Sequence, residues 1–125
     1  QQPVLYTAPT IAIAVLETAA HLDDHGLPLN RYLVRIDVPE DVWARRETLD
    51  VAALPVTWAS IPAGRASVKI GAEWLASMRS AVLLVPSVIV PEESAALVNT
   101  RHPQAQGLRA GIVRRFEYNR LFRAG

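Results

Sequence analysis

The chain of 125 residues contains no cysteine. This absence excludes disulfide bonds, thiolate zinc sites and cysteine nucleophiles, and it fits a cytoplasmic protein. No apolar run is long enough to cross a bilayer, and no basic segment followed by an apolar one opens the chain as a signal peptide does. The six glycines are scattered and form neither GxGxxG nor a P-loop. We therefore expect no membrane association and no glycine-rich phosphate loop.

Lysine is almost absent, because all the basic residues except Lys69 are arginine. Arginine binds phosphate and carboxylate groups in a bidentate geometry better than lysine does, although a GC-rich genome gives the same bias. The formal net charge of +1 favours no class of partner. The last 25 residues are basic, with Glu117 as their only acid, and they contain Arg101, Arg109, Arg114, Arg115, Arg120 and Arg123. A nucleic-acid surface there is one hypothesis, but interleaved aromatics and a helix-turn-helix or zinc pattern are missing.

Half of the residues are hydrophobic, which is enough for the core of one domain. Alternating or continuously apolar segments predict strands over Pro3–Ala8, Arg31–Pro39, Ser80–Ser87 and Leu108–Phe122. Capping and spacing predict a helix from Thr10 to about Gly26, a helical turn after Pro39, and a helix over Gly64–Met78. We expect loops over Leu49–Ile61 and Thr100–Gly107, and a turn or short helix from Pro91. The fold class is therefore α+β or mixed α/β.

Glu17 is unusual because the segment Ile11–Ala20 around it holds only one other polar residue, Thr18. A helix that is apolar nearly all round is expected to be packed on most sides. A carboxylate there is costly unless it is paired with an arginine, caps backbone amides or serves chemistry. His21, four residues later, shares its helix face. No second cluster with ligand spacing follows, so we expect no metal site.

Four other residues are candidates for a site. Ser87 follows a buried strand and a proline, where a rigid core delivers side chains to a cleft, but a turn serine is the ordinary alternative and no G-x-S-x-G motif surrounds it. Tyr6 lies on the first strand beside the Glu17 helix, where core packing is the alternative. Asn99 and His102, in "NTRHP", either bind a ligand or hold loop backbone.

Three stretches together resemble one family. They are "PVLYTAPTIAIAVLETAAHL", "GAEWLASMRSAVLLVPSVIVPEESAALVNTRHPQA" and the closing "FEYNRLF". Each is similar to a block of the RES domain, and their order and spacing cover nearly the whole chain. The resemblance implies a toxin of a bacterial type II toxin–antitoxin pair, with an ADP-ribosyltransferase-like fold, a mixed sheet with flanking helices. It also implies an enzyme that cleaves the nicotinamide–ribose bond of NAD, by phosphorolysis, hydrolysis or transfer of ADP-ribose to a protein.

The resemblance also assigns roles to the candidate residues. It makes Glu17 and Ser87 catalytic, and it places Tyr6, Ser87, Asn99 and His102 at the NAD site, with NAD as a substrate and no further cofactor. Glu17 would stabilise the oxocarbenium-like sugar or align the acceptor. The arginine that names the family belongs upstream of "VLYT". We therefore expect residues 1–125 to be a RES domain that lacks an N-terminal segment of the full-length protein.

The partners implied are an Xre-type helix-turn-helix antitoxin, through which alone DNA is bound, and a protein acceptor. The alternatives are a mono-ADP-ribosyltransferase acting on one cellular protein and a non-catalytic remnant that only binds its antitoxin. A homodimer is a further alternative. Trp43, Trp58 and Trp74 are its interface candidates, although core packing is the default for each.

Overall fold

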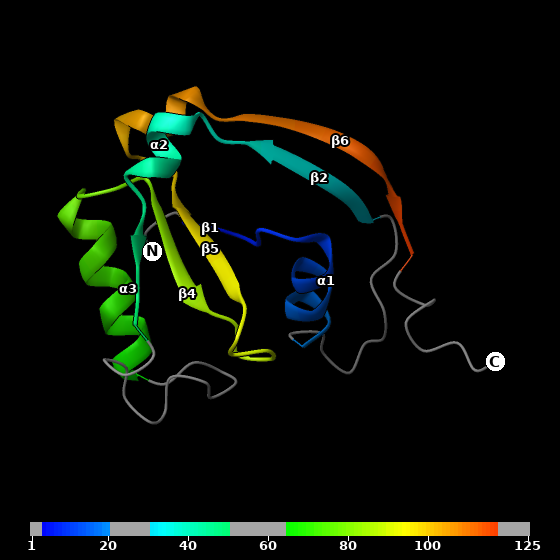
Figure 1. The fold of residues 1–125 in the computed structure, drawn as a ribbon, viewed down its shortest axis with the longest axis horizontal. Coiled ribbons are helices and arrows are strands. Elements are labelled where there is room, and N and C mark those ends of the chain that lie inside the picture. Colours follow the sequence, from blue (N-terminus) through cyan, green and yellow to red (C-terminus); the bar gives the residue numbers. More distant parts are fainter. Residues whose placement is uncertain (1–3, 21–30, 51–64, 118–125) are drawn as a thin grey trace.

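Two separate sheets organise the protein in the computed structural model, which describes residues 4–20, 31–50 and 65–117 (Figure 1). The first is a four-stranded sheet in the order β1-β5-β4-β3. Its strands are β1 (Val4–Thr7), β5 (Ser94–Asn99), β4 (Val82–Pro86) and β3 (Glu47–Thr48). β5 is antiparallel to both β1 and β4, whereas β3 is parallel to β4, so this sheet is mixed. The second sheet pairs β2 (Arg31–Asp37) with β6 (Arg109–Phe116) in antiparallel fashion, and it arches away from the first.

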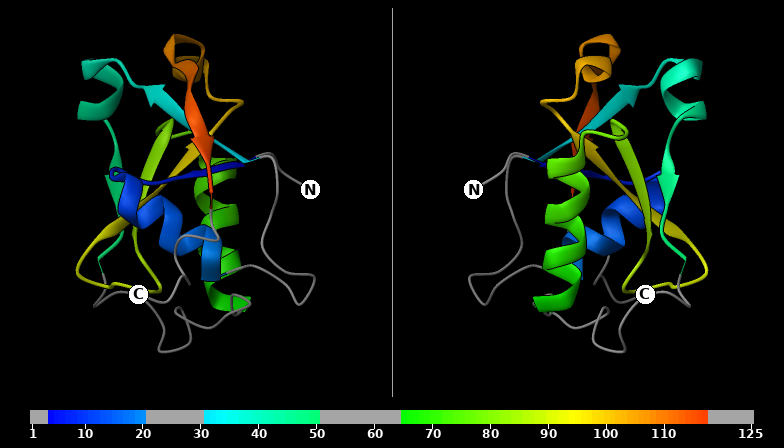
Figure 2. Two further views of the ribbon diagram at one scale, coloured as in Figure 1. Left: turned by 90° about the vertical axis from the view of Figure 1, so that its right-hand side faces the viewer. Right: turned by 90° about the vertical axis from the view of Figure 1, so that its left-hand side faces the viewer.

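In the described residues, three α-helices accompany the sheets. They are α1 (Ile11–Ala20), α2 (Glu40–Ala44) and α3 (Arg65–Ser77), and a 3₁₀ helix covers Pro103–Gly107. Figure 2 shows α3 and α1 on opposite sides of the four-stranded sheet. As predicted, Thr10 caps α1, since its Oγ1 accepts a hydrogen bond from the amide of Ile13 at 3.3 Å. α2 begins after Pro39 with two acids in its first turn, also as predicted. No helix in the described part of the chain is long and apolar enough to cross a membrane.

The core lies between the four-stranded sheet and α2. Its buried members are Val42, Ala81, Val82, Ala96 and Val98, with Val38, Trp43, Leu84 and Leu108 packed against them. The continuous apolar run around β4 is buried because strands lie on both of its edges and side chains cover its faces. The predicted α+β fold is confirmed, and so are the strands corresponding to β1, β2, β4 and β6.

Several features differ from the predictions. Strand β3 was not predicted, and a 3₁₀ helix over Pro103–Gly107 lies within the predicted loop Thr100–Gly107. α1 is not packed on most sides: Ile13 and Val15 are buried, but Ile11 is 55% exposed and Leu16 is also exposed. Apolar composition does not fix the number of neighbours, and α1 lies with only one side against the body. The turn predicted from Pro91 is present, but it leads into strand β5, which the sequence analysis did not predict.

Several predictions fall outside the described residues. They concern the end of the first helix at Gly26, the metal-type pair of Glu17 with His21, Trp58 with most of the Leu49–Ile61 loop, and the chain after Glu117.

Candidate active site

The elements that carry Glu17 and Ser87 meet at one end of the four-stranded sheet, the end at which β1 and β4 finish. Because β1 and β4 are both antiparallel to β5, their C-terminal ends lie at the same end of the sheet. Thr7 is aligned with Ala96, which is aligned with Leu84. α1 begins soon after β1, and Ser87 directly follows β4, so both reach this end, where Figure 1 shows α1 beside the turn between β4 and β5.

Glu17 is half-buried on α1, and its Oε1 atom is shielded from solvent. The neighbouring Thr18 bonds to its own helix, with Oγ1 donating to the carbonyl of Ala14 at 2.9 Å. A carboxylate partly removed from water interacts more strongly with a developing positive charge than an exposed one does. The catalytic role of Glu17 stays a prediction. In the described ranges, no three His, Asp or Glu side chains come together as metal ligands would.

Ser87 is completely buried and organises the turn between β4 and β5. Its Oγ accepts hydrogen bonds from the amides of Ile89 and Val90, each at 3.1 Å. Its own amide donates to the carbonyl of Glu93 at 2.8 Å, which closes the turn. The hydroxyl keeps one hydrogen to donate. These contacts support the turn-serine reading, and the NAD contact of Ser87 stays a prediction.

Tyr6 lies on β1, which forms an edge of the sheet, and its side chain is 73% exposed. It is not packed into the core. By register it pairs with Leu97, which shares a sheet face with Asn99, the residue that bonds to α3. Its ring therefore lies toward the α3 side of the sheet and is accessible to a ligand.

Asn99 ties the end of β5 to the end of α3. Its Nδ2 donates to the carbonyl of Leu75 and to the sulfur of Met78, each at 3.3 Å. Its Oδ1 accepts from the amide of Arg101 at 3.0 Å. These contacts support the structural role of Asn99.

His102 is also used by the backbone. Its Nδ1 accepts from the amide of Gln104 at 3.1 Å, so its proton lies on Nε2, which donates to the carbonyl of Met78 at 3.0 Å. Met78 has a φ of 56°, the left-handed conformation that ends a helix. Asn99 and His102 together hold the C-terminal end of α3 against the sheet.

The structure does not bring all the predicted site residues together. Ser87 lies beside the start of β5, and Asn99 is its last residue. Ser87 and Asn99 therefore lie at opposite ends of the sheet, which the length of β5 separates by about 17 Å. Glu17 and Ser87 lie at one end of the sheet, whereas Asn99 and His102 lie at the other end. An NAD-binding role for the latter two stays a prediction.

Ser80 is buried and central to a polar network, although no motif in the sequence marks it as a site residue. Ser80 Oγ accepts from Trp74 Nε1 at 3.0 Å and donates to the carbonyl of Val82 at 3.0 Å. Nearby, Glu47 accepts a hydrogen bond from Arg79 at 2.9 Å and raises the pKa of Arg79 above its usual value. The network joins α3, β3 and β4. In the sequence, its only signal is a serine that precedes an apolar run.

The packing of Trp43 and Trp74, the two described tryptophans, favours a role in the core over a role in an interface. Trp74 is buried, and Trp43 packs against the core with the Arg46 guanidinium 4.5 Å from its ring centre.

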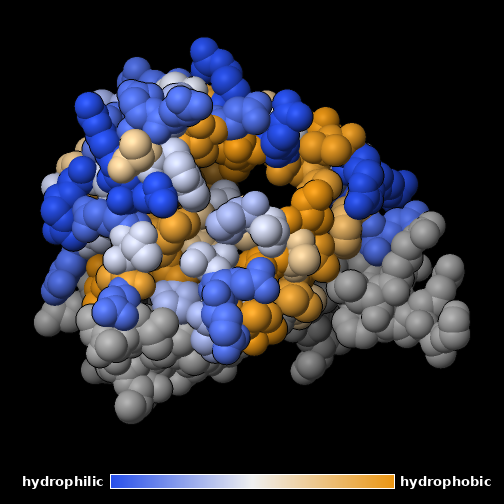
Figure 3. All heavy atoms as spheres, in the orientation of Figure 1, coloured by the Kyte–Doolittle hydropathy of each residue, from blue (hydrophilic) through white to orange (hydrophobic). Residues whose placement is uncertain are grey.

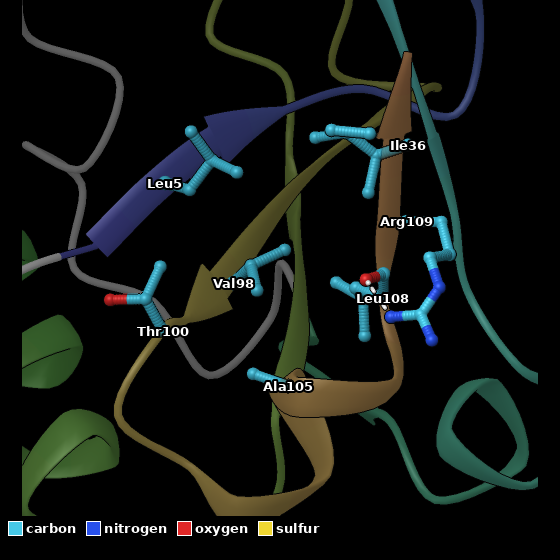
Figure 4. A pocket seen from close by; sticks show the side chains of 8 residues that line it. Leu5, Ile36, Val98, Thr100, Ala105, Leu108 and Arg109 are labelled. Carbon is cyan, nitrogen blue, oxygen red and sulfur yellow. Dashed lines mark hydrogen bonds between the residues drawn. The ribbon is translucent and has the colours of Figure 1, made fainter.

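A hollow of about 150 Å³ lies between the two sheets (Figure 4). Apolar side chains line most of it, and Arg109 stands at its side with a hydrogen bond to the carbonyl of Leu108 at 3.5 Å. The lining residues are Leu5, Ile36, Val98, Thr100, Ala105, Leu108, Arg109 and Ala110. It contains none of the predicted site residues.

A mixed sheet flanked by helices, with a half-buried glutamate and a buried serine at one end, defines a small α+β domain of the kind that the sequence resemblance implies. The RES domain family matches residues 1–119, so the chain belongs to the RES domain family.

Three curated relatives are toxins by name. The "Prs ADP-ribosylating toxin" of Sphingobium sp. (strain YBL2) is 51% identical over 116 residues, which cover 93% of this chain and 72% of the relative. A "Toxin Res" of Photorhabdus laumondii subsp. laumondii is 35% identical over 78% of this chain and 61% of its own length. A "Toxin Res" of Pseudomonas putida is 32% identical over 97% of this chain and 81% of its own length.

Proposed function

We propose that this domain is the catalytic part of a toxin that transfers ADP-ribose from NAD to a protein. The observation that carries the proposal is the 51% identity, over 93% of the chain, to a relative named for ADP-ribosylating Prs. We propose the corresponding Prs protein as the acceptor. The toxin names of the relatives support a toxin–antitoxin context. Within it, we propose a cytoplasmic toxin that is restrained by an Xre-type antitoxin.

The proposed reaction is a substitution at the sugar carbon that bears nicotinamide. The bond from this carbon to the ring nitrogen breaks, and its electron pair neutralises the pyridinium, so nicotinamide leaves without needing a proton. A side-chain nucleophile of the acceptor forms the new bond and gives up its proton. Positive charge develops on the ribose between these events, as in glycoside hydrolysis.

We assign to Glu17 the stabilisation of this positive charge on the ribose. Its half-buried carboxylate, with Oε1 shielded from water, is already oriented and loses little hydration when the charge develops. Tyr6 has an exposed ring on β1, but this ring lies on the α3 side of the sheet and α1 lies on the other, so a contact of Tyr6 with nicotinamide stays a prediction. Ser87 holds the turn between β4 and β5, at the same end of the sheet as α1.

The test uses the full-length toxin freed of antitoxin, with NAD and purified Prs. We expect Prs to gain the mass of ADP-ribose and nicotinamide to be released in equal amount. Glu17→Gln should lower this rate about 100-fold or more while the protein stays folded. The matched control is Glu40→Gln, the same change at an exposed position in α2, which should leave the rate unchanged.

Three outcomes would contradict the proposal. NAD consumed equally without Prs, giving ADP-ribose or its phosphate, would identify a glycohydrolase or phosphorylase. NAD untouched in every mixture would leave a domain that only binds its antitoxin. Normal turnover by Glu17→Gln would remove Glu17 from the chemistry.

A further inference from the structure

The ribbon formed by β2 and β6 has open edges. Among the described strands, each pairs only with the other. A two-stranded ribbon is marginally stable by itself, and an unpaired strand edge offers amides and carbonyls to another chain. β6 is the more accessible strand, since every residue except Phe116 is exposed. It also follows the outer rim of the arch in Figure 1.

One face of the ribbon is mostly apolar, although the register also places Arg115, opposite Tyr32, at its outer end. Residues paired across the two strands share a face, which places Val34 with Ile112 and Ile36 with Ala110. The near end of this apolar face lines the hollow of Figure 4, so the face is turned toward the body. Farther out it is uncovered, with Ile112 at 71% and Tyr32 at 55% exposure. Figure 3 shows hydrophobic surface on both sides of the opening beneath the arch.

The opposite face of the ribbon is basic. The register places four arginines on it, and Asp37 is the only acid that the two strands carry. Asp37 is 3.2 Å from Arg35. The four arginines are Arg31, Arg35, Arg109 and Arg114.

We infer that the free edge of β6 binds an extended segment of a partner protein in which apolar and acidic residues alternate. An added strand would pair its backbone with β6 and continue both faces of the ribbon. Its apolar side chains would cover Ile112 and its neighbours on the body side, and its carboxylates would meet Arg109 and Arg114 on the other side.

The same charges disfavour other occupants. A second copy of β6 added at this edge would place arginines beside arginines, which is unfavourable between neighbouring strands. Nucleic acid would meet the basic face but would leave the exposed aliphatic face uncovered, and such binding ordinarily uses stacked aromatics. Only an alternating acidic strand complements both faces. The inference does not depend on the proposed reaction.

The test measures binding of a fluorescent peptide to the full-length protein by anisotropy. The peptide is Thr-Glu-Val-Glu-Val-Glu-Val-Glu-Thr. One control has the same composition with its glutamates in a single block, and a second has lysine in place of every glutamate. We expect saturable binding of the alternating acidic peptide only, with slowed amide exchange along β6.

Protein variants locate the binding surface. Arg109→Glu combined with Arg114→Glu should weaken binding of the acidic peptide about tenfold or more and create binding of the lysine peptide. That gain shows that the variant is folded. Arg45→Glu combined with Arg101→Glu changes the net charge equally at exposed positions outside the ribbon and should have little effect.

Four results would overturn the inference. They are equal binding of the alternating and block peptides, equal weakening by the two double variants, displacement of the peptide by a DNA duplex that binds more tightly, and a dimer in sedimentation that the ribbon variant abolishes. The last two would assign the edge to nucleic acid or to a second copy.

Discussion

Replacing Ser87 with alanine tests whether its hydroxyl holds the turn or the substrate. Ser87 is completely buried, and its Oγ accepts from the amides of Ile89 and Val90 at 3.1 Å. Each such bond contributes about 0.5–1.5 kcal/mol net, and alanine supplies no acceptor in its place. We therefore expect Ser87→Ala to lower the free energy of unfolding by about 1–3 kcal/mol.

The measurement is urea denaturation followed by circular dichroism, supported by thermal melting, in which each kcal/mol corresponds to about 4 °C for a domain of this size. Ser77→Ala is the matched control. Its Oγ donates to the carbonyl of Trp74 at 2.7 Å and accepts from the amide of Arg79 at 3.2 Å, but Ser77 is exposed, so water replaces both lost bonds. We expect this control to change the free energy of unfolding by about 0.5 kcal/mol or less.

NAD affinity, measured at a temperature where both proteins are folded, completes the test. If Ser87→Ala has the same urea midpoint of unfolding as the wild type yet binds NAD much more weakly, the hydroxyl contacts the substrate. The claim that it stabilises the turn is then refuted. If stability falls and the NAD affinity of the folded fraction is kept, the hydroxyl serves the turn.

Three further substitutions test the polar contacts around α3. Trp74→Phe removes the buried donor to Ser80 and should lower the free energy of unfolding by about 2 kcal/mol, whereas an unchanged urea midpoint would show that the bond contributes nothing. His102→Ala removes both ring contacts, to Met78 and Gln104, and should cost about 1–3 kcal/mol in the same assay. Met78→Gly relieves backbone strain of about 1 kcal/mol at the φ of 56°, but it also removes the weak sulfur acceptor of Asn99, so we expect a small rise in melting temperature. A lower melting temperature would mean that the lost side-chain contact outweighs the strain.

Most of the secondary structure could be predicted, because each predicted element carries a local signal. β2 alternates, β4 is a continuous apolar run that ends at a proline, and α1 begins at a capping threonine. β5 carries no such signal, since "SAALVN" contains two alanines, a serine and an asparagine, which all have low strand propensity. It is a strand because β1 and β4 pair with it on either side.

The missing strand also explains what could not be predicted about the site. Without β5 and its direction, nothing in the sequence says that Ser87 and Asn99 lie at opposite ends of one sheet. The sequence identifies polar residues after strands but not their hydrogen-bond partners. Asn99 and His102 could be recognised as special, but only the structure shows that backbone groups and Met78 occupy their polar atoms.

The distribution of hydrogen bonds divides the predicted site residues by what their replacement should change. Asn99, His102 and Ser87 are buried and bonded to backbone groups, so their replacement should first lower stability. Tyr6 is largely exposed and Glu17 is half-buried, so their replacement should leave the fold nearly intact and act on turnover. Both belong to the continuous segment formed by β1 and α1, but the Tyr6 ring lies on the α3 side of the sheet, whereas α1 lies on the opposite side. If the proposed reaction is correct, activity and stability are therefore separable, with the chemistry on β1 and α1 and the stabilising polar contacts at the two ends of β5.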